Sequence, residues 1–258
     1  MPAVEGQSTL PGTAEPLRFI PWLAGSLVIF NCLLLFPYTW WALTGFLVIP
    51  QEPLLIRHID LDSESNLITW YSSLLLILMA EAALVNFGLD SAAKGERSWL
   101  RYAWLGIGGV AVFLSLDEVA MIHESVSMLV KQQLADSSFA TGGPEVDRRT
   151  WILAYTPGIL AVICGFLFVF LRLFRGRRGP LLCGLGGLTL WICSLVWEFF
   201  GDDFARVWGN KGLMLETVLE EGSEIFGTTA LLVAFAWYGW ERLSVVLSDR
   251  HQNIVGPS

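Results

Sequence analysis

The sequence predicts an all-α integral membrane protein, a polytopic bundle of about six transmembrane helices. Of its 258 residues, 54% are hydrophobic and only 16% are charged, whereas a soluble domain carries about a quarter charged residues. The apolar residues fall into separate runs of about 20, the length that an α-helix needs to cross a bilayer. No dense basic surface accompanies them, so nucleic acid is not an expected partner; the expected surroundings are the lipid bilayer.

The predicted domain organisation is simple. We expect a disordered polar tail over residues 1–18, a six-helix transmembrane domain over residues 19–243 and a polar tail over residues 244–258. The first tail lacks the basic start of a cleaved secretory signal, so the first span is expected to act as an uncleaved anchor. The four cysteines all lie in apolar runs without a CxxC pair, and we interpret them as packing residues.

Each predicted span has its own signals. Tryptophan and tyrosine mark the membrane interfaces at Trp40-Trp41 in the first span and Trp70-Tyr71 in the second. Glycines in the third and fifth spans allow close approach between helices. The six spans are predicted over residues 19–43, 67–87, 102–130, 151–174, 180–200 and 213–242.

Lysine and arginine predict the orientation, because short loops rich in these residues stay in the cytoplasm. The loops after the second and fourth spans are the basic ones, which places both of them and both termini on the cytoplasmic side. We therefore expect a multi-pass inner-membrane protein. The residues concerned are Lys94, Arg97 and Arg101 in the first loop and Arg172, Arg175, Arg177 and Arg178 in the second.

Ionisable residues inside the spans give the functional signal. The third span contains Asp117-Glu118 and, after four intervening residues, His123-Glu124. Each ionisable residue in a span costs roughly 2.5–3.5 kcal/mol on insertion scales, and such residues usually face the bundle interior. The sixth span carries Glu216, Glu220 and Glu224, whose four-residue spacing forms one stripe on a helix.

These residues are expected to meet near the non-cytoplasmic face. At 1.5 Å per residue, the acids of the third and sixth spans and Glu198 of the fifth lie between that interface and the midplane, and Glu81 of the second span reaches a similar depth. Asp117 and Glu124 are seven residues apart, so they point almost the same way if the helix is continuous.

So many carboxylates cannot all stay ionised in a low-dielectric site, and a bound metal is one solution. Carboxylates with one imidazole suit Fe, Mn or Zn better than Ca or Mg. The candidate metal ligands are Asp117, His123, Glu124, Glu198, Glu216, Glu220 and Glu224. Glu118 and Glu221 are candidate general acids or bases.

The sequence therefore favours a metal site in the outer half of the bundle. If the protein is an enzyme, it is expected to be a metal-dependent membrane oxidoreductase or hydrolase acting on a lipid-like or membrane-soluble substrate. Two alternatives stay open. The acids can form a cation or proton path in a transporter, or they can stabilise packing in an accessory subunit that meets partner membrane subunits.

Overall fold

The computed structural model is an all-helical bundle, and no strand occurs in the part of the chain that it describes. It describes residues 16–46, 53–61, 66–92, 99–122, 125–126, 128–129 and 149–255. Six of its helices are long and apolar enough to cross a membrane, which confirms the predicted fold class. They are α1 (Pro16–Thr44), α3 (Leu67–Ala92), α4 (Tyr102–Ala120), α6 (Arg149–Leu173), α7 (Arg178–Trp208) and α8 (Asn210–Val255), and a short helix, α2 (Pro53–Ile59), follows α1.

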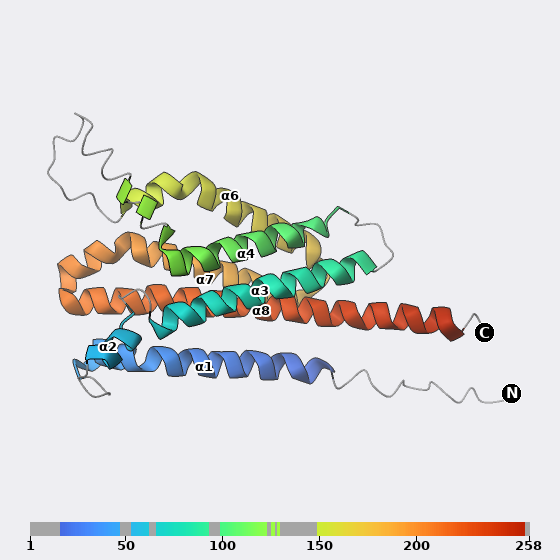
Figure 1. Cartoon of the computed structure of the whole chain (residues 1–258), viewed down its shortest axis with the longest axis horizontal. Helices are drawn as coiled ribbons and strands as arrows, with labels where there is room; N and C mark the ends of the chain where they lie inside the picture. The colour runs from blue at the N-terminus through green and yellow to red at the C-terminus, as the bar shows by residue number, and fades with distance from the viewer. Residues whose placement is uncertain are drawn as a thin grey trace.

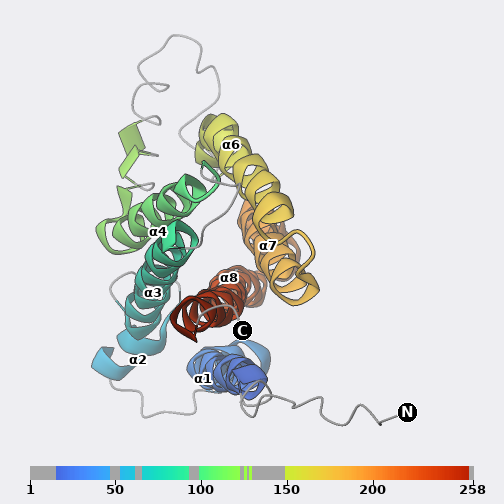
Figure 2. The same cartoon turned by 90° about the vertical axis from the view of Figure 1, so that its right-hand side faces the viewer.

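The helix α8 is the axis of the bundle. It packs against α7, α3 and α1, while α4 packs mainly against α3 and α6 against α7. The end-on view shows α8 in the centre and the other spans around it (Figure 2). The side view shows that the start of α1 and the end of α8 lie at the same end of the bundle (Figure 1).

Two predicted boundaries differ from the structure. The predicted polar tail after residue 243 is largely helical, because α8 continues to Val255. The predicted disordered tail over residues 1–18 overlaps α1, which begins at Pro16, and the rest of it lies outside the described residues. The connection between α7 and α8 is also shorter than expected: only Gly209 separates them, with a positive φ of 60°.

Close contact between α7 and α8 depends on two glycines. A Cβ atom added at Gly187 would lie 2.7 Å from the backbone oxygen of Gly227, and one added at Gly227 would lie 3.0 Å from the oxygen of Gly187. Beside them, Trp191 Nε1 donates a hydrogen bond to Thr228 Oγ1 at 3.0 Å. Small residues at a crossing point let helix backbones approach closely in lipid.

Polar contacts fix the other helices around α8. Tyr71 of α3 donates to Asn31 Oδ1 of α1 at 2.7 Å, and Asn31 Nδ2 donates to Thr229 Oγ1 of α8 at 2.9 Å. All three residues are buried. Because lipid offers no alternative partners, such buried hydrogen bonds hold helices in one register.

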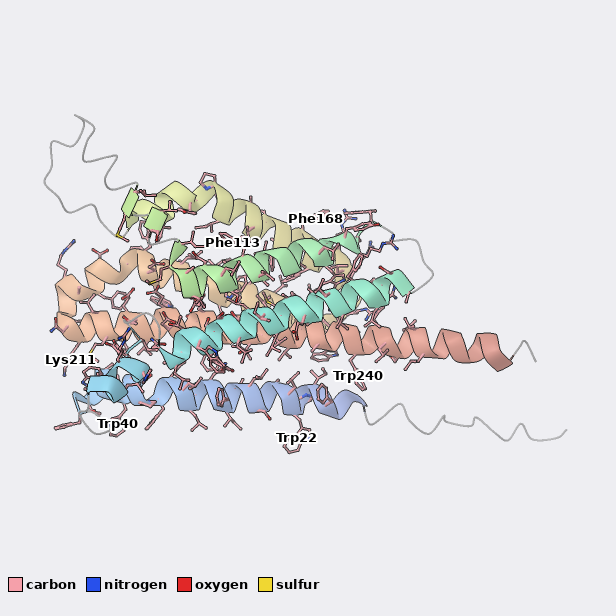
Figure 3. All side chains as sticks on the ribbon, in the orientation of Figure 1. Trp22, Trp40, Phe113, Phe168, Lys211 and Trp240 are labelled. Atoms are coloured by element: carbon pink, nitrogen blue, oxygen red, sulfur yellow. The ribbon has the colours of Figure 1, made fainter. Side chains whose placement is uncertain are left out.

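The face of α1 that points away from α8 is apolar. Trp22 is 75% exposed and Trp40 is 44% exposed, and both lie on the outer side of the bundle (Figure 3). In a helix that spans a bilayer, this face contacts lipid, with the tryptophans suited to the interfacial zones.

The glycine contact gives a first test. Gly187→Ala is expected to destabilise the protein by about 1–3 kcal/mol, because the added methyl group overlaps the α8 backbone. Gly186→Ala is the matched control, since a Cβ there meets nothing within 4 Å. Unfolding in detergent, followed by circular dichroism, measures both; equal stability of the two variants would contradict this contact.

Candidate functional site

Four glutamates of α7 and α8 interact through their charges. Glu220 of α8 experiences the charges of Glu198 on α7 and of Glu216 and Glu221 on α8. We call Glu198, Glu216, Glu220 and Glu221 the glutamate cluster. Glu216 is completely buried, whereas the other three are half-buried. The cluster therefore combines a buried carboxyl with three that lie closer to the surface.

Glu216 fits into a notch in α7. An ideal Cβ at Gly201 would lie 2.6 Å from Glu216 Oε1 and 2.8 Å from its Cδ, so only glycine leaves room for this carboxyl group. The tight turn at Gly209 brings the end of α7 back alongside the start of α8. The notch and the turn together position Glu216 inside the helix pair.

The cluster concentrates negative charge in a membrane span. The charged groups acting on Glu220 are carboxyls, and carboxylates this close in a low-dielectric site cannot all be ionised. The arrangement therefore suits a proton or another cation held between the side chains.

The glutamate cluster contains four of the nine predicted site residues. Glu198, Glu216 and Glu220 are predicted metal ligands and Glu221 is a predicted acid or base, and these roles stay predictions. Glu224 continues the α8 stripe one turn further and is half-buried. A metal-binding role for this stripe stays a prediction.

The acids of the third span are arranged differently from the prediction. The helix α4 ends at Ala120, where Met121 takes a left-handed conformation with φ 51° and ψ 45°. The expected continuous helix to residue 130 is therefore wrong, and the shared direction inferred for Asp117 and Glu124 has no basis, because it assumed that continuity. Asp117 and Glu118 lie half-buried in the last turn of α4, while His123 and Glu124 lie outside the described residues.

Within the part of the chain that the structure describes, convergence of three or four helices on one zone is likewise not seen. The cluster comes from α7 and α8, while α4 packs mainly against α3. Glu81 lies on the exposed face of α3, so it does not join the cluster. Among the residues that the structure describes, no three His, Cys, Asp or Glu side chains are arranged to hold a metal ion.

A second polar site lies at the opposite end of the bundle, and sequence reasoning missed it. Asp90, near the end of α3, accepts hydrogen bonds from Trp104 Nε1 of α4 at 2.9 Å, Tyr238 OH of α8 at 2.9 Å and Arg242 Nε of α8 at 2.8 Å. Next to it, Arg177 forms an ion pair with Glu241 at 3.0 Å. We call this group of six residues the Asp90 latch.

One signal in the sequence points to the latch. Asp90 is an acid at the end where the loops are basic, and Arg242 closes the sixth span at that same end. Opposite charges at the same depth in two spans indicate an ion pair.

The glycine notch gives a second test, in the form of a double-mutant cycle. Gly201→Ala is expected to cost about 1–3 kcal/mol in the wild-type background, because the methyl group displaces the Glu216 carboxyl. In a Glu216→Asp background the shorter side chain leaves room, so the same substitution costs clearly less. Unfolding in detergent gives the four free energies. Equal costs in the two backgrounds would show that the two residues are not in contact.

Comparison with known proteins assigns a family. No curated protein and no solved structure matches the chain. One family model matches residues 23–238, a stretch that begins inside α1 and ends inside α8, and so includes the glutamate cluster and Asp90. The chain therefore belongs to the family described as "Domain of unknown function (DUF8692)".

Proposed function

We propose that this membrane protein binds a cation at the glutamate cluster, holding protons when no metal is present and exchanging them for a divalent metal ion. One observation carries the proposal: Glu220 lies among three other carboxyl groups within a span, one of them completely buried. Ionisable groups are costly in a membrane and are retained there mainly for function.

The chemistry of the side chains defines the cation. Carboxylate oxygens favour Mg, Ca and Mn, and an added imidazole shifts the preference toward Mn, Fe or Zn. The described carboxyls are not arranged as a ligand set, so metal binding requires rotation of glutamate side chains or ligands from the segment after α4. His123 and Glu124 belong to that segment and stay predicted ligands, as do Asp117 and Glu224.

We also propose an orientation in the membrane. The α6–α7 turn carries Arg175, Arg177 and Arg178, and it lies at the same end of the bundle as the start of α1 and the end of α8 (Figure 1). The positive-inside rule assigns this end to the cytoplasm. In this orientation the glutamate cluster opens to the opposite side, in an inner membrane.

An enzymatic role would follow from the bound metal. A metal ion lowers the pKa of a bound water to about 7, and a nearby carboxyl group can then carry the proton. Glu221 lies in the cluster and Glu118 lies on α4, so Glu221 is the better placed for this role. The substrate class that fits a site within the bilayer is a lipid-like or membrane-soluble molecule.

Metal binding by the purified full-length protein tests the proposal. Mn²⁺ is expected to bind saturably, with protons released as it binds, and to bind more weakly as the pH falls because protons compete for the same oxygens. Glu216→Gln and Glu220→Gln are expected to weaken binding by at least tenfold. Electron paramagnetic resonance of free Mn²⁺ and proton release into a weak buffer provide the two measurements.

Glu81→Gln is the matched control, since it removes a carboxyl from an exposed position in another span. It is expected to bind Mn²⁺ as the wild type does. Absence of saturable binding, or equal binding by all the variants, would overturn the proposal.

A further inference from the structure

We infer that the Asp90 latch closes one end of the bundle, so that the glutamate cluster exchanges cations with only one face of the membrane. The closure is argued from the latch itself, while its consequence for cations rests on the proposed function.

The latch connects four elements through one carboxylate and its neighbours. Asp90 of α3 is 9% exposed and accepts hydrogen bonds from donors on α4 and α8. Arg177, immediately before α7, pairs with Glu241 and lies over the Tyr238 ring, with its Cζ 4.8 Å from the ring centroid. The end of α3, the starts of α4 and α7 and the part of α8 around Tyr238 and Arg242 are therefore held together at a single place.

Aromatic rings fill the bundle next to the latch. Trp104 packs edge to face on Phe235 at 5.2 Å between ring centroids, Phe235 lies 5.9 Å from Phe170, and Phe170 stacks on Phe174 at 5.3 Å. All four side chains are completely buried. Packed aromatic rings present no polar groups along which water or an ion can move.

The buried side-chain amide of Asn86, beside these rings, is already hydrogen-bonded. Asn86 of α3 donates to the backbone oxygen of Phe235 at 3.0 Å, and its Oδ1 lies 2.5 Å from where a Cβ on Gly239 would be. Asn86 thus holds α3 against α8 beside the aromatic rings, which strengthens the closure of this end of the bundle.

The glutamate cluster lies toward the other end of the bundle. Glu198, Glu220 and Glu221 are half-buried, whereas Glu216 is completely buried. From Glu216 to Arg242, α8 rises about 39 Å, more than the roughly 30 Å hydrocarbon core of a bilayer. The cluster and the latch therefore face opposite sides of the membrane.

Alkylation of Cys183 tests the closure. This residue of α7 packs against the aromatic core, and its Sγ donates to the Ala230 oxygen at 3.2 Å. With the other three cysteines replaced by serine, a membrane-impermeant thiol reagent is expected to react slowly with Cys183. Arg242→Ala removes the cation that neutralises Asp90, and the rate is expected to rise at least tenfold.

Two further variants make the alkylation result specific. Arg242→Lys keeps the positive charge and is expected to return the rate toward the wild-type value. Arg206→Ala removes an arginine from an exposed ion pair with Asp203 at the cluster end and is expected to change nothing. An unchanged rate in Arg242→Ala, or equal acceleration by Arg206→Ala, would overturn the closure.

Sidedness of Mn²⁺ binding in proteoliposomes tests the consequence. The fraction of molecules in each orientation is measured with a Lys211→Cys variant that has no other cysteine. Residue 211 is an exposed position in the first turn of α8, so an impermeant thiol reagent labels only the molecules whose cluster end faces outward. External Mn²⁺ is expected to bind only to those molecules whose cluster end faces outward. When the protein also carries the Arg242→Ala substitution, external Mn²⁺ is expected to bind to molecules in both orientations.

The two experiments separate the two hypotheses. If Mn²⁺ binds from neither face, the proposed function fails, while the alkylation rates still decide whether the latch closes the bundle. If Mn²⁺ fills both orientations of the protein that retains Arg242, the cluster is open to both faces and the inference fails.

Discussion

The fold depends on one constraint: the polar side chains of α8 must find partners inside the bundle, because lipid offers none. The glutamates lie in its first half, Thr228 and Thr229 lie near its middle, and Tyr238 and Arg242 lie further along. Neighbouring helices supply residues at each level. Glu198 of α7 interacts with the first group, Asn31 of α1 and Trp191 of α7 bond to the second, and Asp90 of α3 bonds to the third.

Glycines make this arrangement possible where α7 and α8 approach most closely. Gly201 leaves room for a buried carboxyl, and the Gly187–Gly227 contact brings α7 and α8 together in the middle. Without these close approaches the polar groups of α8 would be separated from their partners. The same helix pair then carries both a stable contact and a concentrated negative charge.

Much of the fold could be predicted from the sequence, because a run of apolar residues about 20 long has few other interpretations. The four-residue spacing of Glu216, Glu220 and Glu224 also predicts a stripe of acids on one helix, and all three residues lie on α8. The break at Met121 could not be predicted, since a single left-handed residue leaves no mark on hydrophobic periodicity. The helical end of α8 was missed for a similar reason: beyond the membrane its residues are polar, and no apolar pattern signals their helix.

The sequence also could not predict which residues each acidic side chain contacts. Depth along a span can be counted from 1.5 Å per residue, but the neighbour across a helix contact depends on which helices touch. The acids of the third span were assigned to the neighbourhood of α8, whereas α4 packs mainly on α3. Asp90 was passed over because Arg242, its partner, lies 152 residues away in the chain.

The most direct test of cation binding at the cluster is anomalous scattering from crystals of the protein soaked in Mn²⁺. A peak between the carboxyl groups of Glu198, Glu216 and Glu220 is the expected result. A protein with Mn²⁺ bound only at other places, or with none bound, would contradict the central claim.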